Sequence, residues 1–192
     1  MKCLFYFIVF AIAANSDATN KPLFLPQLPV GEYKINTIAL LRCELSTDLI
    51  KFNYYLSKTS VNTTEIKGNA TFNEPLDDSF NIEINLAVKD SVGGWRDNAH
   101  VFKTPKACSS LKMWAGPFWT TFTENIGMHN VNCPIPAGRY IASGIKLNSD
   151  MYANLPKQFF YGTYKFRFQL TKNKVVHGCA ISIIEVKRPW ET

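Results

Sequence analysis

Strict alternation of apolar and polar residues is the feature that most restricts the fold of this chain. In SFNIEINLAV, residues 79–88, every second residue is apolar. DLIKFNYYL, residues 48–56, and YKFRFQL, residues 164–170, repeat the pattern. Because successive side chains of a strand point to opposite faces, this alternation predicts strands with one face on a core and the other in water.

Turn signals separate these segments at short intervals. They are Lys67-Gly68-Asn69, Gly93-Gly94, Pro134 to Gly138 and Gly162, and TKNK, residues 171–174, predicts a hairpin turn. Short strands spaced in this way are typical of an antiparallel sandwich rather than of a parallel sheet with crossover helices. The predicted fold class is therefore all-β.

One aromatic segment interrupts this pattern. ACSSLKMWA, residues 107–115, predicts about two helical turns, and Pro117 predicts the start of another turn after Gly116. The apolar residues that follow helical spacings of three and four are Leu111, Trp114, Phe118, Phe122 and Ile126. The chain therefore predicts a β-sandwich with one short, partly helical excursion.

The N-terminus has the composition of a secretory signal peptide. Lys2 precedes an eleven-residue apolar run, residues 4–14, and small residues follow. Such a run is too short to span the roughly 30 Å core of a bilayer. We predict a signal peptide over residues 1–18 with cleavage between residues 13 and 18, an extended arm over 19–42 and one domain over 43–192. The expected location is secreted and extracellular.

The cysteines and glycosylation sequons fit an exported protein. The chain has five cysteines, of which Cys3 would leave with the signal peptide. The four that remain are Cys43, Cys108, Cys133 and Cys179. An even count in an exported chain predicts two disulfides, but the spacing leaves all three pairings open. Asn62 and Asn69 lie in NTT and NAT sequons and are expected to carry glycans.

Motifs for catalysis, metal binding and nucleic-acid binding are lacking in the sequence. It has three histidines and no GxSxG, HExxH or metal-spaced His/Cys cluster, and His177 is interpreted as a strand residue. Asp77-Asp78 is interpreted as a turn pair, not a spaced acid/base couple. We predict no catalytic residue, cofactor, metal or nucleic-acid partner. Residues 151–184 contain no acidic residue, which fits a solvated strand face or an anionic membrane surface.

Several motifs occur in an order that resembles a known family. CPIPAGRY, residues 133–140, is followed by NLPKQFFYGTYKFRFQL, residues 154–170, and HGCAISI, residues 177–183. Upstream lies KGNATFNEPLDDSFNIEINLAVKDSVGGW, residues 67–95. This series resembles the lysosomal ganglioside-activator proteins of the ML lipid-recognition superfamily, over roughly residues 43–187. The length and the four mature cysteines are more similar to the insect chemosensory B proteins.

The resemblance implies a β-cup, in which two antiparallel sheets splay apart around an apolar cavity with loops at its mouth. It implies the bridges Cys43–Cys179 and Cys108–Cys133, the second of which closes the aromatic segment into a loop. The implied function is non-enzymatic binding of a lipid, fatty or hydrocarbon-like ligand in chemosensation, as in pheromone perception. A receptor, a channel or a membrane surface is the implied partner.

Two alternatives remain at this point. One is a ganglioside-activator-like cofactor that extracts or transfers lipid for a hydrolase, in lysosomes or extracellular fluid. The chain lacks two further bridges of the lysosomal proteins and has an added N-terminal arm. The other is an interaction module without a cavity, such as an immunoglobulin-like sandwich, for which a cysteine–tryptophan–cysteine core is expected.

The expected ligand-binding residues come from the aromatic segment and from two strands. Those expected to line or cover the entrance are Trp114, Phe118, Trp119 and Phe122. Those expected to form the walls are Ile84, Leu86, Phe166 and Phe168. Trp95, after the Gly93-Gly94 turn, is a further candidate for the rim. The competing interpretation is that all these side chains are ordinary sandwich core.

Overall fold

A computed structural model describes residues 29–43, 49–60, 63–128, 132–146 and 155–191. The predicted signal peptide, the first part of the predicted arm and Asn62 lie outside the described residues. The fold is all-β with two short helices, as predicted. Neither helix in the described ranges is long and apolar enough to cross a membrane.

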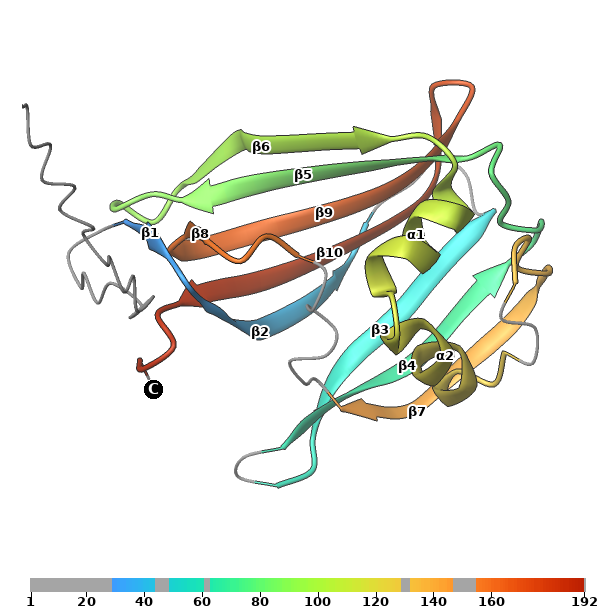
Figure 1. Cartoon of the computed structure of the whole chain (residues 1–192), viewed down its shortest axis with the longest axis horizontal. Coiled ribbons are helices and arrows are strands. Elements are labelled where there is room, and N and C mark those ends of the chain that lie inside the picture. The colour runs from blue at the N-terminus through green and yellow to red at the C-terminus, as the bar shows by residue number, and fades with distance from the viewer. Residues whose placement is uncertain (1–28, 44–48, 61–62, 129–131, 147–154, 192) are drawn as a thin grey trace, which may run out of the picture.

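Ten strands and two helices make up the described chain (Figure 1). The strands are β1 (Val30–Gly31), β2 (Lys34–Arg42), β3 (Ile50–Lys58), β4 (Thr64–Phe72), β5 (Asn81–Lys89), β6 (Trp95–Thr104), β7 (Gly138–Lys146), β8 (Phe159–Phe160), β9 (Gly162–Lys172) and β10 (Val175–Lys187). The helices are α1 (Ala107–Ala115) and α2 (Phe118–Asn125). Both helices fall in the aromatic segment, where helical turns are predicted.

The main sheet divides into two walls because β10 changes its partner. Gly178 and Cys179 of β10 pair in parallel with Ile50 and Lys51 of β3. From Ala180 onward, the same edge of β10 pairs with β2 in antiparallel fashion. We call this point the fork. The large wall is β6-β5-β9-β10-β2 and the small wall is β3-β4-β7, and Figure 1 shows them diverging from the fork.

The alternating segments form the strands that they predict. Ile82, Ile84 and Leu86 of β5 stand opposite apolar residues of β9, and the intervening residues of both strands are mainly polar. Ile82 and its partner Leu170 are fully buried. The predicted hairpin at TKNK is also confirmed, since β9 ends at Lys172 and β10 begins at Val175.

Gly68 is a correction, because the predicted turn at residues 67–69 lies in the middle of β4. Gly68 has a φ of +125° and stands beside a register shift in the pairing of β4 with β7. A Cβ atom here would meet the carbonyl oxygen of Asn53 at 2.0 Å. Glycine therefore permits a bulge and a close backbone approach within a strand, which the sequence does not distinguish from a turn.

The domain begins earlier than predicted. Residues 34–42, predicted as part of an extended arm before a domain starting at Cys43, form β2 and pair with β10 from Lys187 to Ala180. The reason is that Ile35, Thr37 and Leu40 are partly buried and complete the edge of the large wall. The short strands β1 and β8 form a separate two-stranded sheet.

Both disulfides have the predicted pairing. Cys43–Cys179 lies at the fork and Cys108–Cys133 joins α1 to the segment before β7. The second bridge encloses α1 and α2 in one covalent loop, as predicted. Two disulfides are compatible with an extracellular protein.

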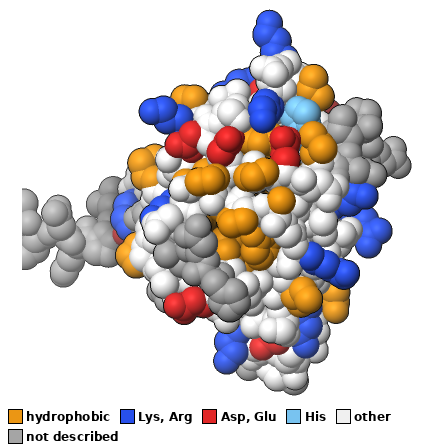
Figure 2. Space-filling model, turned by 90° about the vertical axis from the view of Figure 1, so that its right-hand side faces the viewer, with side chains coloured by type: hydrophobic (Ala, Val, Ile, Leu, Met, Phe, Trp, Pro, Cys, Tyr) orange, Lys and Arg blue, Asp and Glu red, His pale blue; other side chains and the backbone are white. Residues whose placement is uncertain are grey.

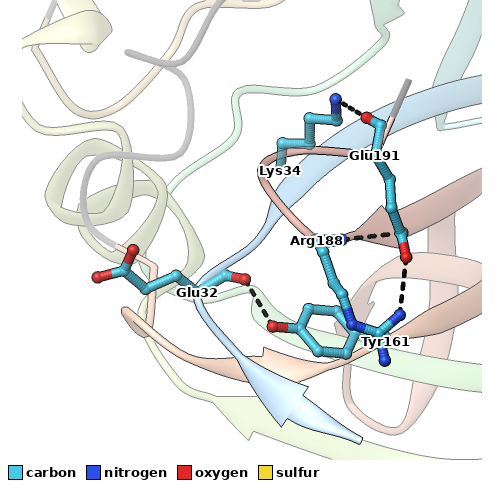
Figure 3. A network of polar contacts seen from close by, with 5 residues as sticks. All are labelled: Glu32, Lys34, Tyr161, Arg188 and Glu191. Carbon is cyan, nitrogen blue, oxygen red and sulfur yellow. Dashed lines mark hydrogen bonds and ion pairs between the residues drawn. The ribbon is translucent and has the colours of Figure 1, made fainter. Parts of the chain in front are cut away.

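A polar network, the terminal clasp, joins the two ends of the described chain (Figure 3). The side chain of Lys34 donates to the backbone carbonyl of Glu191. The Arg188 guanidinium donates to the Glu191 carboxylate at 2.7 Å and lies 4.5 Å from the centre of the Tyr161 ring. The Tyr161 hydroxyl donates to the carbonyl of Glu32 at 2.9 Å. The clasp thereby ties the segment around β1 and β2 to Tyr161, between β8 and β9, and to the end of β10.

Candidate functional site

Two separate clusters of buried side chains lie between the walls. The first surrounds the fork and the helices and includes Ile50, Phe80 and Leu170. The second lies at the far end of the large wall and is built on Leu86, Tyr164 and Val186. Phe159 of β8 packs against the second cluster, so the β1–β8 sheet covers that end.

The inner face of the large wall is partly exposed between these clusters. Phe102, Ile84, Phe168 and Ala180 lie side by side across four strands of this wall. Phe102 is 50% exposed, and the other three are half-buried. In the neighbouring row towards the fork, by contrast, Ile82 is 0% exposed.

We define the inner apolar patch as Ile84, Phe102, Phe166 and Phe168. All four side chains face inward by strand register, and none is fully buried. Ile84, Phe166 and Phe168 pack against the two clusters but keep part of their apolar surface exposed.

The small wall faces this patch with aromatic residues of β3. Phe52 and Phe168 make an edge-to-face contact across the walls, with ring centres 6.2 Å apart. Tyr54, two residues farther from the fork, stacks on Phe52 at 6.3 Å. The walls therefore touch at Phe52, and Tyr54 lies beyond that contact.

The helices lie across the side of the molecule between β6 and β7, as Figure 1 shows. Trp119 of α2 is only 5% exposed and belongs to the first cluster. Trp114, Phe118 and Phe122 are half-buried against the same cluster. The helical segment therefore covers one side of the first cluster and also contributes side chains to it.

The eight predicted ligand-binding residues fall into two groups. Trp119 and Leu86 are buried in the two clusters, so for these two the structure supports core packing. Apolar side chains of the two clusters pack around Trp119 and Leu86 and bury both. The six that stay partly exposed are Trp114, Phe118, Phe122, Ile84, Phe166 and Phe168. The structure brings the last three together in the inner apolar patch.

Three residues of the site are absent from the sequence prediction. Phe52 and Tyr54 carry a usable signal, since both belong to the inward set of the alternating segment DLIKFNYYL. Phe102 carries no such signal, because β6, with the sequence WRDNAHVFKT, does not alternate. Its inward position follows only from its pairing with Ile84.

Trp95 is not at the rim of the inner face. It pairs with Lys89 at the start of β6, and the Lys165 ammonium lies 5.2 Å from the centre of its ring. Lys165 belongs to the polar, outward set of β9 and pairs with Ala87. Trp95 therefore lies on the outer face of the large wall.

Parts of both outer faces are polar, whereas Leu41, which is 49% exposed, pairs with Ile181 on the outer face of the large wall. On the large wall, Asn85, Asp97, Asn98, Lys165 and Arg167 line a concavity of about 260 Å³ together with Ala87. On the small wall, the sequon residue Asn69 stands between Asn53 and the exposed Ile141. A glycan at Asn69 would therefore project from the outer face, away from the inner apolar patch.

Apolar side chains also reach the surface at the fork end of the molecule. Figure 2 shows this end with apolar side chains gathered in a hollow near its middle. Charged side chains lie around the hollow. In the part of the chain that the structure describes, no group of three His, Cys, Asp or Glu could hold a metal ion.

Burial raises the pKa of several tyrosines between and around the walls. The pKa of Tyr54 is raised to about 12, and those of Tyr33, Tyr140 and Tyr164 are raised for the same reason. In Tyr164, the nearby Arg96 guanidinium opposes the shift. The phenol is neutral at physiological pH in all four and can donate a hydrogen bond.

In comparison with known proteins, no family model and no curated protein matches this sequence. Its function is therefore inferred from the residues described above.

Proposed function

We propose that this chain is an exported, non-enzymatic protein that binds a lipid or hydrocarbon-like ligand between its two walls. The observation that carries the proposal is the inner apolar patch, which faces inward but remains partly exposed between two packed clusters. Residues of both walls and of α1 and α2 would contact the ligand.

The size of the hydrophobic effect makes such binding feasible without polar chemistry. Burial of each methylene is worth about 0.8 kcal/mol, so a chain of about sixteen carbons gains roughly 13 kcal/mol. Association costs at least about 4 kcal/mol of this gain, and ordering and imperfect packing cost more. The balance is enough for micromolar binding, which needs about 8 kcal/mol.

The biological setting follows from the family resemblance and is part of the same proposal. We propose membership of the ML lipid-recognition superfamily, with a role in chemosensation like that of the insect chemosensory B proteins. The ligand would then be a pheromone or another lipid, which the protein would carry or present to a receptor, a channel or a membrane surface. The two walls parting at a fork and the disulfide-enclosed helical segment support this assignment.

Binding of an environment-sensitive fluorescent fatty probe to the disulfide-intact protein tests the proposal. Phe102→Gln should weaken the probe affinity about fivefold, because it removes roughly 1 kcal/mol of apolar contact from a half-exposed side chain. Val101→Gln is the matched control, since Val101 is the adjacent residue, is 48% exposed and faces outward. Equal effects of the two substitutions, or no uptake by the folded protein, would contradict the proposal.

Native mass spectrometry of protein purified from its source tissue provides the second test. Co-purifying lipid masses that disappear on unfolding support a lipid carrier. A clean polypeptide mass, together with no probe uptake, would favour an interaction module without a cavity.

A further inference from the structure

Charge is divided unequally between the inner and outer faces of the strands. The acidic residues of the described strands all lie on outer faces. Three of them alternate with residues that pack inward in the two clusters, and the other lines the concavity on the outer face of the large wall. In chain order, the acidic residues are Glu65, Glu83, Asp97 and Glu185.

The charged residues on the inner faces of the described strands are, by contrast, all basic. Arg42, Lys58 and Arg96 lie there by strand register, and Lys172 lies over an aromatic ring of the first cluster. Lys172 has an acidic partner, Glu74, at 3.6 Å. An inner surface whose strand charges are basic complements an anion and repels a cation.

His100 lies next to the inner apolar patch. It is two residues from Phe102, about 7 Å along β6, and it pairs with Leu86, the partner of Phe166. Its ring packs against Phe159, with ring centres 5.1 Å apart. The side chain is half-buried, and neither ring nitrogen bonds to another described residue. An imidazole N–H is therefore available at the border of the patch.

Arg96 lies beside His100 on the same side of the large wall. It pairs with Val88, and its guanidinium is near enough to Tyr164 to oppose the rise in the pKa of that phenol. Val88 is two residues from Leu86, the partner of His100, so Arg96 and His100 are neighbours across one step of β5. Arg96 is exposed, and no carboxylate of the described residues lies within ion-pair distance of it.

The position of β6 places both side chains where the inner surface meets water. β6 is the end strand of the large wall (Figure 1), and Phe102 on this strand is 50% exposed. A ligand whose chain covers the inner apolar patch can therefore keep its head group hydrated beside Arg96. Such a ligand avoids the cost of burying a charge.

We propose that the ligand is an anionic amphiphile, such as a long-chain fatty carboxylate, whose head group binds Arg96 and His100. This inference rests on the proposed function and specifies the ligand class for the same site. The carboxylate accepts hydrogen bonds from the Arg96 guanidinium and from an N–H of His100, while the chain lies against the inner apolar patch. An alkane lacks the group that these donors bind, and an amine is repelled.

Protection of an end strand is the competing explanation for Arg96. A charged side chain on such a strand discourages pairing with other chains. This explanation predicts that the charge of Arg96 has no effect on the affinity for a ligand. The two explanations therefore differ in one measurable quantity.

Displacement of an uncharged fluorescent fatty probe by hexadecanoate and by 1-hexadecanol tests the inference. The two ligands have the same chain length, and at pH 8 only hexadecanoate is charged. Arg96→Gln should weaken hexadecanoate about fivefold and leave 1-hexadecanol unchanged, because an ion pair at an accessible site is worth about that factor. His100→Phe, which keeps an aromatic ring against Phe159, should act in the same direction.

The effect of salt is a second readout, which a purely structural role of Arg96 would not change. Added salt screens an accessible ion pair, so it should lower the affinity for hexadecanoate relative to 1-hexadecanol in the unaltered protein. This relative effect should be smaller in Arg96→Gln.

Arg167→Gln is the matched control, because Arg167 is an exposed arginine on the outer face of the same wall. This variant should bind both ligands as the unaltered protein does. Circular dichroism should show that all variants fold, since Arg96 and Arg167 are exposed and phenylalanine retains the ring packing of His100.

The outcomes separate this inference from the proposed function. If the probe does not bind and neither ligand is taken up, the proposed function fails as well. If both ligands bind and Arg96→Gln changes neither affinity or changes both equally, the site stands but Arg96 does not recognise an anion. An equal loss of hexadecanoate in Arg167→Gln would show a general effect of net charge and would overturn the inference. A selective loss in Arg42→Gln alone would overturn it too, and would place the head group at β2.

Discussion

At the residue scale, Asp78 shows how one exposed side chain positions a helix. Its carboxylate accepts hydrogen bonds from the backbone N–H of Ser109 at 2.9 Å and from the Ser109 hydroxyl at 2.6 Å. Ser109 lies in the first turn of α1, and Lys106, at the N-cap position, makes no side-chain capping bond. Asp78 therefore caps α1 from a segment 31 residues earlier.

Asp78→Ala should lower the free energy of unfolding by about 1 kcal/mol at pH 7, the usual value for loss of a helix N-terminal cap. Ser109→Ala, which removes only the hydroxyl donor, should cost less. Urea denaturation of the three proteins measures both effects. An Asp78→Ala variant as stable as the unaltered protein would show that α1 needs no external cap.

The same contact predicts a dependence of stability on pH. The hydrogen bonds from Ser109 hold the pKa of Asp78 below its ordinary value of 3.8. The stabilisation is therefore present above pH 3.8 and is lost as the pH falls through the lower, folded-state value. The difference between the unaltered protein and Asp78→Asn should accordingly shrink below pH 3.8.

At the element scale, the strands that alternate strongly are predictable from sequence and the others are not. In β5 and β9, the alternation of apolar and polar residues indicates the face on which most side chains lie, although the apolar Ala87 lies on the outer face. In β6, Arg96 and His100 occupy inward positions by register, so its pairing with β5, rather than its own sequence, defines the strand. The helical spacing of the aromatic segment predicts α1 and α2, but it does not predict that Trp119 would be buried.

The terminal clasp gives a prediction about the β1–β8 sheet. Arg188→Ala removes the guanidinium that binds Glu191 and lies over the Tyr161 ring. Amide hydrogen exchange in β1 and β8 should then increase well before exchange in β5 and β9 changes, because only the covering sheet loses a contact.

Arg139→Ala is the control for this effect, since Arg139 is an exposed arginine of β7 in the other wall. Its exchange pattern should match that of the unaltered protein. Uniform acceleration in all strands of the Arg188→Ala variant would show that the clasp supports the whole fold instead of its covering sheet.

At the scale of the whole molecule, the two disulfides constrain different parts of the fold. Cys43–Cys179 spans 136 residues and joins the end of β2 to β10 at the fork, whereas Cys108–Cys133 spans 25 residues and encloses the helices. The pairing follows from the family resemblance and is confirmed. The fork could not be predicted from the sequence. It forms where β10 changes its pairing from β3 to β2, and both of these strands are far from β10 in the chain.

Replacing each pair of cysteines by serine should separate stability from binding. In the chain-entropy account, loss of Cys43–Cys179 should cost about 1.5 kcal/mol more than loss of Cys108–Cys133, because the loop it closes is longer. Loss of Cys108–Cys133 should instead weaken uptake of the fatty probe, since Trp114 and Phe118 are no longer held in place. Thermal unfolding and probe titration measure the two effects, and the reverse ranking in both would contradict this division.

The parting of the walls at Ala180 has a mechanical consequence. Past that residue, no strand pairing joins β10 to β3 in the ranges that the structure describes. The two walls are joined at the fork by the pairing of β10 with β3, whereas Cys43–Cys179 joins the end of β2 to β10 within the large wall. Moving the two walls apart to admit a bulkier ligand would therefore disturb the side-chain packing between them. The strand pairing within each wall would stay intact.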